Sequence, residues 1–459
     1  MIIYAILSAL TWLAVTLLSH GWLGTMGFFY DLPNGQMPFG RFFILYIFAF
    51  FLYLLSVFKI HKLPVNRRSI TIVFTGAVLF RMFLLPGIPI HENDVYRYIW
   101  DGKVFTSGIN PYKYPPIQAS IKPGSPDRQT DFKKLKSIRD ENSGFYRRIS
   151  FKDVTTVYPP LAQAVFALSA LLAPGSILFM KFLFVLFDIG VVFLLYALLK
   201  SLKQNPLYVV IYAWNPLVLK EFANSGHYDA IAICCVTAAV YLILKEKYIF
   251  SSVFLGLGVL AKFYPLIFIP FFLLKKQYKP FLMSLAIVAA GYLPFIFWGH
   301  TGLAAVFAGF GTYAGQWSGN GFIFALIYSF SSVFAKYPYL VSKMVCGGIF
   351  IIIWTLICFN KRDMTEKMFR AVTAMFLLSP VGVPWYFCWV IPFLCVYRKY
   401  SLISLSYLLI LHYFVFTRDF GSLSIGSFKI DNLLLMQYVP FYFMLLSESL
   451  VYRRFYIVK

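Results

Sequence analysis

The sequence predicts an all-α polytopic membrane protein with about 12–14 transmembrane helices. Hydrophobic residues make up 60% of the 459 residues and charged residues only 13%. A soluble protein of this length could not bury so much apolar surface. Apolar runs recur from one end of the chain to the other, so we expect a single transmembrane domain over residues 1–459.

Most of these apolar runs are long enough to span a bilayer. The runs of spanning length are 2–23, 41–58, 70–90, 176–199, 206–222, 229–244, 281–298, 339–358, 401–417 and 433–451. Shorter runs at 249–261, 263–274, 369–381 and 384–397 indicate paired helices, and 159–173 and 322–335 are short enough to be re-entrant. The first run lacks a basic segment before it, so we expect a retained span rather than a signal peptide.

Basic residues predict the orientation of the spans. The short turns on one side hold 20 Lys and Arg residues, against three on the other side: Lys262, Arg418 and Lys429. The positive-inside rule assigns the richer side and both termini to the cytoplasm. Most of the net charge of +23 then comes from Lys and Arg in the cytoplasmic turns, where these residues lie near anionic lipid headgroups. The charge therefore does not indicate nucleic-acid binding. The motif-like polar clusters fall on the outer face.

One of these clusters opens a long outer loop, residues 91–158, which carries 12 basic and 8 acidic side chains. Val95, Tyr98, Ile99 and Phe105 share one side of a predicted short helix that can lie along the membrane surface. From 122 to 152 the chain is polar and charged, which is typical of a mobile or substrate-gated excursion.

Asp94 is the leading catalytic candidate, because a carboxylate at the end of a span can take a proton from a hydroxyl nucleophile. Glu92 lies beside it. The alternative for Asp94 is a helix N-cap, which Asp fills well, and both roles are compatible. His91 and Glu92 are also metal-ligand types, but the sequence offers no clear third ligand.

The remaining clusters each have a plain structural alternative. Tyr158 precedes two prolines, which are common at a helix start. Residues 224–229 form a polar turn, but a turn needs only Asn and Gly, so His227 and Asp229 are not required for it. Lys262 stands on the side where Lys is rare, where it binds a lipid phosphate or extends to the headgroups. Trp385 and Tyr386 suit an interface, a sugar ring or an isoprenoid chain equally. Arg97 and Lys103 are weaker phosphate ligands. All six cysteines lie in apolar segments and are expected to pack there.

In this order, the clusters resemble the integral-membrane glycosyltransferases of the GT-C superfamily. The similarity is greatest to the bacterial polyprenol-phosphate-mannose-dependent mannosyltransferases. The segments that carry it are 93–102, 108–112, 157–163, 214–217, 226–229, 262–265 and 379–386. Three positions differ from the family pattern: Asn93 replaces one of two adjacent acids, Tyr228 stands in a Gly-His-Asn-Asp motif, and Val383 stands where a His often precedes Pro-Trp-Tyr.

The resemblance implies an inverting transfer of a hexose, mannose first, from a polyprenyl-phosphate donor to a glycan or glycolipid hydroxyl at the outer face of a bacterial plasma membrane. Asp94 is the position that matches the family's base. Because the leaving phosphate is anionic it needs a cation, for which Lys262 is the first choice, with Arg97 or His227 assisting. Glu92, Asn93, Tyr158, Asp229, Trp385 and Tyr386 are expected to bind substrate. No cofactor is expected, although Glu92 leaves a divalent metal as an alternative.

Two other classes of protein fit part of this pattern. A transporter or flippase of lipid-linked sugars would carry ionisable residues near the middle of the membrane and show symmetry between its halves. Here the polar clusters gather at one face and no internal repeat is evident. An O-antigen polymerase or ligase usually carries its large loop late in the chain, whereas this loop comes early.

Overall fold

The computed structural model describes residues 1–21, 39–121, 129–416, 420–425 and 428–456, and these residues are mostly helical. The predicted all-α class is confirmed. Six described helices are long and apolar enough to cross a membrane: Ile2–Ser19, Phe39–Ile60, Ile177–Ser201, Tyr278–His300, Pro338–Phe359 and Asn432–Leu450. Seven apolar helices of 10–17 residues accompany them. The chain is therefore a membrane protein.

The chain forms two compact units, which we describe one at a time. Unit 1 comprises Met1–Gly87, Val192–Glu221 and Ser318–Lys459, and unit 2 comprises Ile88–Val191 and Phe222–Trp317.

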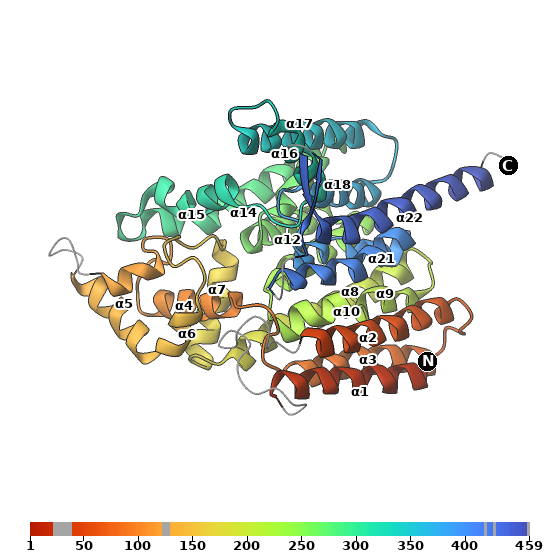
Figure 1. Cartoon of the computed structure of the whole chain (residues 1–459), viewed down its shortest axis with the longest axis horizontal. Helices are drawn as coiled ribbons and strands as arrows, with labels where there is room; N and C mark the ends of the chain where they lie inside the picture. Colours follow the sequence, from red (N-terminus) through yellow and green to blue (C-terminus); the bar gives the residue numbers. More distant parts are fainter. Residues whose placement is uncertain (22–38, 122–128, 417–419, 426–427, 457–459) are drawn as a thin grey trace. The chain divides into compact units, whose positions relative to one another are not determined.

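Unit 1 is built mainly from the first three helices and the C-terminal third of the chain. Its elements are α1 (Ile2–Ser19), α2 (Phe39–Ile60), α3 (Arg67–Leu84), the end of α8 (Ile177–Ser201), η5 (Pro206–Val209), α9 (Val210–Ala213), α10 (Pro216–Leu219), α16 (Phe322–Ser331), α17 (Pro338–Phe359), α18 (Met364–Leu378), α19 (Pro384–Phe387), α20 (Ile391–Tyr397), α21 (Tyr400–Leu408), η9 (Leu409–Phe416), β1 (Ser422–Ile425), β2 (Phe428–Asp431) and α22 (Asn432–Tyr456). The strands form an antiparallel hairpin with Ser422 opposite Asp431. Helices α1, α2 and α3 lie side by side (Figure 1).

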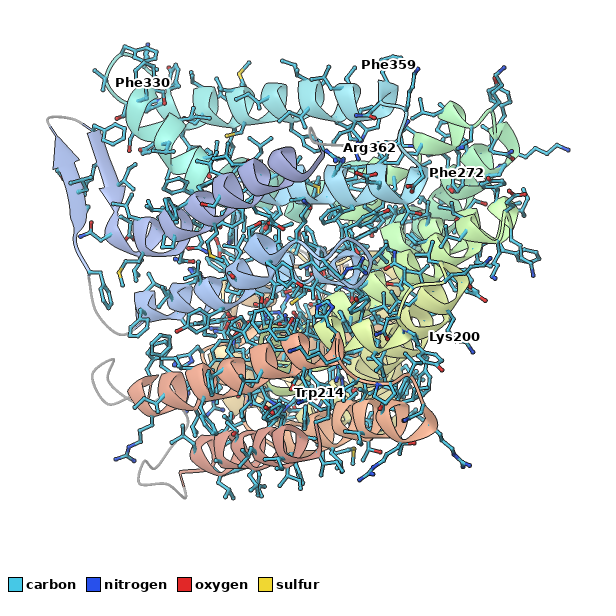
Figure 2. The ribbon with its side chains drawn as sticks, turned by 90° about the vertical axis from the view of Figure 1, so that its right-hand side faces the viewer. Lys200, Trp214, Phe272, Phe330, Phe359 and Arg362 are labelled. Atoms are coloured by element: carbon cyan, nitrogen blue, oxygen red, sulfur yellow. The ribbon has the colours of Figure 1, made fainter. Side chains whose placement is uncertain are left out.

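The surface of unit 1 carries large apolar side chains, as a lipid-facing surface does. Phe330 on α16 and Phe359 on α17 project outward and are mostly exposed (Figure 2). Trp214, in contrast, is buried and donates its indole N–H to the carbonyl of Val73 at 2.9 Å. The ring lies so close to Gly76 that a Cβ there would meet it at 2.6 Å.

Unit 1 also encloses an ion pair. Lys220 Nζ lies 3.3 Å from Glu221 Oε1, and both side chains are fully buried. The Tyr413 hydroxyl donates to the same carboxylate oxygen at 2.8 Å, while the Lys220 ammonium stands 3.5 Å from the centroid of the Tyr413 ring. Tyr413 thus stabilises both charges: its hydroxyl donates to Glu221, and the face of its ring contacts the Lys220 ammonium.

The predicted continuous span over 206–222 is wrong. The segment is broken into η5, α9 and α10, followed by a π-helical turn, η6 (Lys220–Asn224). Asn205 and Asn215 each accept from the amide two residues on, at 2.9 Å, and a proline follows each of them. Each Asn-Pro pair therefore ends one helical piece and begins the next. The apolar run 401–417 is likewise divided, between α21 and the 3₁₀ helix η9.

Unit 2 contains the long loop and the helices that pack on it. Its elements are α4 (Asp94–Thr106), η3 (Pro116–Ser120), α5 (Gln129–Glu141), α6 (Ser143–Arg148), α7 (Pro160–Leu172), the start of α8, α11 (Asp229–Leu244), α12 (Tyr248–Ala261), η7 (Tyr264–Phe268), α13 (Phe271–Leu274), α14 (Tyr278–Phe297), η8 (Trp298–His300) and α15 (Gly302–Gln316). Helix α4 packs on α7, and α12 packs on both α11 and α14. The predicted short helix after residue 94 is confirmed.

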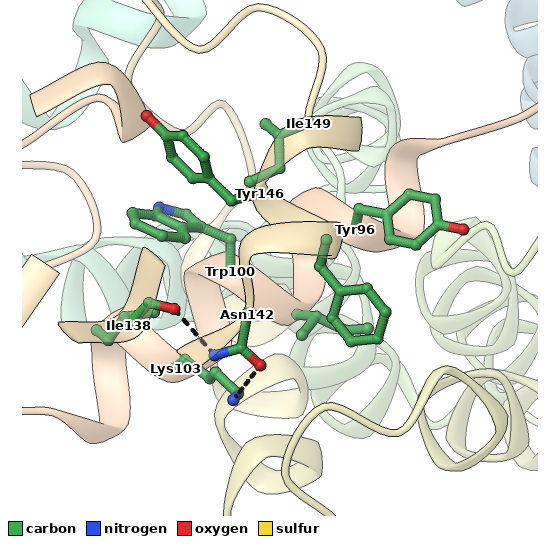
Figure 3. A pocket seen from close by; sticks show the side chains of 9 residues that line it. Tyr96, Trp100, Lys103, Ile138, Asn142, Tyr146 and Ile149 are labelled. Atoms are coloured by element: carbon green, nitrogen blue, oxygen red, sulfur yellow. Dashed lines mark hydrogen bonds between the residues drawn. The ribbon is translucent and has the colours of Figure 1, made fainter. Parts of the chain in front are cut away.

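Within the expected mobile or substrate-gated excursion over 122–152, residues 129–148 form the helices α5 and α6, and residues 122–128 lie outside the described residues. Phe132, Leu135 and Ile138 are the buried face of α5. Figure 3 shows how Ile138 joins Trp100 on α4 and Tyr146 on α6 around a small pocket. A three-residue apolar stripe within a charged helix was therefore enough to dock it on α4.

Candidate active site

The chain that enters α4 is held by an amide side chain from a distant turn. Asn224 donates through Nδ2 to the Ile88 carbonyl at 3.0 Å and accepts through Oδ1 from the Ile90 amide at 3.0 Å. Asn224 is fully buried, and its bond to the Ile90 amide is shielded from water. This pair of bonds fixes the backbone shortly before Asp94. The sequence placed Asn224 in a polar cluster without giving it a role.

Asp94 is the first residue of α4, not its N-cap. The cap position belongs to Asn93, whose side chain makes no capping bond. The predicted capping role of Asp94 is therefore wrong. Its carboxylate accepts a long hydrogen bond from the Tyr98 hydroxyl at 3.5 Å, and the side chain is 36% exposed. An acid at a helix N-terminus is stabilised as an anion by the helix dipole, and this one is reachable from outside.

A cation from a different helix hairpin stands in the same unit. Lys262 follows α12, Asp229 opens α11, and the two side chains form an ion pair of 3.0 Å between Nζ and Oδ2. The ammonium also lies 4.4 Å from the centroid of the Tyr228 ring. Asp229 is 0% exposed and Lys262 is 14% exposed, so the lysine alone reaches the surface. The pair joins ends of α11 and α12 that are 33 residues apart in sequence.

These groups act electrostatically on Asp94. Burial raises the pKa of the Asp94 carboxyl above its ordinary value, Lys262 opposes the rise, and the Asp229 carboxylate adds to it. His227 Nδ1 lies 4.0 Å from Asp94 Oδ2. Burial and Asp229 favour the protonated form of Asp94, and Lys262 favours the ionised form.

Aromatic rings surround the carboxylates. Tyr98, Tyr158, Phe166 and Tyr228 form a cluster in which the ring centroids are 4.7–5.7 Å apart. The Tyr158 carbonyl accepts from the Tyr112 hydroxyl at 2.7 Å, which fixes the backbone at the start of α7. The cluster excludes water from one side of the site and so strengthens the charge interactions there.

Arg97 is engaged in a network of its own. Its Nε donates to Asp101 Oδ1 at 2.8 Å, and its Nη2 donates to the Val154 carbonyl at 3.1 Å. Gln163 bridges Asp101 and Thr156, at 3.2 and 2.8 Å. Arg97, Asp101 and Gln163 are buried. The network ties α4 to α7 and to the segment before it, a role that the spacing of Arg97 and Asp101 (i, i+4) could have suggested.

Helix α4 also meets α7 through its backbone. A Cβ on Gly102 would collide with the carbonyl of Phe166. Only glycine permits this approach. The separation of the two helices is therefore set by main-chain atoms.

Asn93 faces the loop rather than the carboxylates. Its amide donates to the Arg148 carbonyl at 3.1 Å and to Ser150 Oγ at 2.7 Å. His91 and Glu92 are buried. Among the described residues there is no group of three or more His, Cys, Asp or Glu side chains that could hold a metal ion.

Trp385 and Tyr386 belong to unit 1, on the short helix α19. Their rings meet edge to face at 5.9 Å, and Tyr386 stacks on Trp389 at 4.3 Å. Their role in binding substrate stays a prediction. The other predicted site residues, from Glu92 to Lys262, all belong to unit 2.

The sequence was compared with protein families and with solved structures. Residues 5–276 match the family model described as alpha-(1->6)-mannopyranosyltransferase, N-terminal domain. The chain belongs to this family. The match spans more than half of the chain, and Asp94, His227, Asp229 and Lys262 lie inside it. No solved structure matches the chain.

The protein is therefore a membrane glycosyltransferase of a GT-C mannosyltransferase family, as the resemblance implied. It acts with a sugar donor, an acceptor and the membrane. The family match ends before α15, so the aromatic residues of α15 and α19 lie outside it.

Proposed function

We propose that the protein transfers a mannosyl residue from a polyprenyl-phosphate donor to a hydroxyl of a glycan or glycolipid, with inversion at the anomeric carbon. The proposal depends mainly on one observation: an accessible carboxylate, Asp94, and a partly exposed cation, Lys262, lie in the same unit. A base and a phosphate ligand are what this transfer needs.

Asp94 acts as the general base. The acceptor hydroxyl approaches to hydrogen-bonding distance of its carboxylate, about 2.6–3.2 Å, and loses its proton as its oxygen attacks the anomeric carbon. The bond between that carbon and the phosphate oxygen breaks, and its electron pair leaves with polyprenyl phosphate. A single displacement of this kind inverts the anomeric centre.

Lys262 stabilises the leaving phosphate. Asp229 offsets the unfavourable burial of the ammonium and fixes its position, and the Tyr228 ring, with its centroid 4.4 Å from Nζ, stabilises it further. Arg97 is the poorer candidate, because its Nε and Nη2 are already bonded to Asp101 and Val154. His227, 4.0 Å from Asp94, is placed to contact the same substrate. No metal or cofactor is part of this mechanism.

The reaction takes place on the extracytoplasmic face, with both termini in the cytoplasm. The excess of Lys and Arg in the opposite turns supports this orientation. The plasma membrane of a bacterium is the membrane we propose.

The direct test measures release of polyprenyl phosphate by the purified protein in liposomes that contain polyprenyl-phosphate mannose, with a membrane-glycan extract as acceptor. Asp94→Asn keeps the shape of the side chain and removes its basicity. We expect kcat to fall by about 10²–10⁴-fold while donor binding is unchanged. The matched control is Asp140→Asn, an exposed acid on α5, which we expect to keep full activity.

Three outcomes would contradict the proposal. Release that survives Asp94→Asn places the base elsewhere. Equal release from other polyprenyl-phosphate sugars removes the assignment of mannose. Donor binding without release, in the presence of the extract, favours a flippase.

The orientation has a separate test. Ser137 on α5 and Asn360, after α17, are exposed, and each is replaced by cysteine in turn. In intact cells, a membrane-impermeant maleimide is expected to label Ser137→Cys and to spare Asn360→Cys. The reverse pattern would place the site in the cytoplasm.

A further inference from the structure

Three aromatic residues of unit 2 are not used by the proposed mechanism: Phe151, Tyr313 and Trp317, which we call the ring platform. The Phe151 and Trp317 rings meet edge to face at 4.5 Å, and the Tyr313 and Trp317 rings are 5.7 Å apart. Phe151 is 58% exposed, although it touches Trp317. Tyr313 and Trp317 are half-buried. The platform therefore presents aromatic surface to the outside.

Phe151 is held in a conformation that Phe rarely adopts. Its φ is +50°, in the left-handed region, which costs a residue with a Cβ roughly 1–2 kcal/mol. The strain is not offset by burial, because more than half of the side chain is exposed. A residue kept strained and exposed is a candidate for function rather than for folding.

The platform rests on a rigid contact. Gly309 on α15 lies so close to the carbonyls of Thr155 and Thr156 that a Cβ would collide with them. Tyr313 and Trp317 follow Gly309 at intervals of four, which places them on the same side of α15. Contact at Gly309 thus aligns the platform with the segment that leads back to Phe151.

That segment is itself fastened to α4 and α7. Arg97 binds the Val154 carbonyl, and Gln163 binds Thr156. The position of Phe151 is therefore linked to the network beside Asp94.

Helix α15, on which Tyr313 lies, also contacts the segment that carries Lys262. Phe310 on α15 packs against Phe263, the residue after Lys262, with ring centroids 4.4 Å apart. Helix α15 therefore links the residue after Lys262 to Tyr313 of the platform.

We propose that the ring platform is an acceptor subsite, which stacks on a pyranose ring of the acceptor glycan and directs its hydroxyl toward Asp94; this rests on the proposed function. Aromatic faces bind the C–H faces of sugars and leave the hydroxyls at the edge for polar groups. The rim beside Phe151 is polar: Ser150 Oγ accepts from Asn93, and Lys152 donates to the carbonyls of Arg147 and Ile149. A hydroxyl and an ammonium each have a further N–H or O–H to offer a sugar. An isoprenoid chain, by contrast, has no use for a charged and polar rim.

The test uses the full chain in nanodiscs, with polyprenyl-phosphate mannose as donor and methyl α-mannoside and α-1,6-linked manno-oligosaccharides as acceptor probes. The main variant is Phe151→Gly, because glycine accepts a positive φ and the fold is not expected to lose stability. We expect the KM for the oligosaccharides to rise about tenfold, as loss of one well-placed ring contact does. The donor KM and kcat should not change, and Phe151→Tyr should restore the acceptor KM.

The matched control is Phe250→Ala. Phe250 is 62% exposed near the start of α12, and Lys262 follows the other end of that helix, about 18 Å away. Its replacement should leave both KM values unchanged. A rise in the donor KM with Phe151→Gly, or no change in either KM, would overturn the proposal.

A binding measurement separates this proposal from the proposed function. Saturation-transfer NMR follows a manno-trisaccharide on the Asp94→Asn protein, with and without Phe151→Gly, and needs no turnover. Loss of the signal with Phe151→Gly supports the platform even if polyprenyl-phosphate mannose is not the donor. Unchanged signal, or no signal from the Asp94→Asn protein itself, overturns it.

Discussion

Two ion pairs of the molecule share one chemistry and differ in access. In unit 1 the Lys220 ammonium faces Glu221 and the ring of Tyr413, and in unit 2 the Lys262 ammonium faces Asp229 and the ring of Tyr228. The first pair is sealed. In the second the lysine is partly exposed, and it acts on the accessible Asp94.

The difference shows what makes a buried charge useful. A sealed pair can only hold structure, and its net contribution to stability is small once desolvation is counted. In a partly exposed pair such as Lys262 and Asp229, the ammonium can bind an incoming anion. Asp229 and the Tyr228 ring keep the ammonium in position. Access, and not the strength of the pair, distinguishes the site from the core.

The largest expected effect comes from removing each lysine. Lys262→Ala should lower kcat by roughly 10²–10³-fold, since one cation at the leaving phosphate is lost. It should lower Tm less than Lys220→Ala does, because water reaches the open edge of the Lys262–Asp229 pair. Lys220→Ala should instead destabilise the protein by about 3–5 kcal/mol, because Glu221 is left buried without its countercharge. Initial rates and thermal unfolding in detergent measure both. The control is Lys247→Ala, an exposed lysine at the start of α12. If Lys262→Ala unfolds the protein as Lys220→Ala does, the two pairs have the same role.

Replacing both members of a pair should separate them further. Lys220→Met with Glu221→Gln keeps the volume and removes both charges, so we expect most of the lost stability to return, to within about 1–2 kcal/mol of the wild type. Lys262→Met with Asp229→Asn should fold well and stay inactive. Unfolding midpoints and transfer rates of the single and double variants give the answer. Recovered transfer in the second double variant would show that Lys262 is not needed.

The smallest effect is a change in the pH dependence of kcat/KM. Asp94 must be ionised to accept a proton, so activity falls as the pH drops through its pKa. Lys262 lowers that pKa and Asp229 raises it. Lys262→Ala should therefore move the acidic limb to higher pH, and Asp229→Asn should move it to lower pH. Shifts in the same direction, or none, would mean that another group is the base.

The sequence predicted the fold class and the short helix at Asp94, because these depend on composition and on local periodicity. It did not predict the pairing of Lys262 with Asp229, which brings together residues 33 positions apart. Each was assigned a separate contact with substrate. The sequence placed both residues at the outer ends of consecutive helices, but it did not show that the two side chains bind each other.

Other features were hidden by local signals. The charges of residues 129–148 outweighed the three apolar residues that dock α5, and the hydropathy of 206–222 concealed its two Asn-Pro breaks. Arg97 was assigned to phosphate because its charge is visible in the sequence. The sequence does not show that Arg97 donates to Asp101 and to the Val154 carbonyl.

The contact of Gly102 with the backbone of α7 has a consequence for the entropy of the reaction. Two helices separated by side chains can shift as rotamers change, but main chain against main chain leaves no such layer. Asp94, the base that we propose at the start of α4, is thus held in place before any substrate arrives. The conformational entropy of positioning Asp94 is lost once, when the chain folds. It is not lost again in each catalytic cycle.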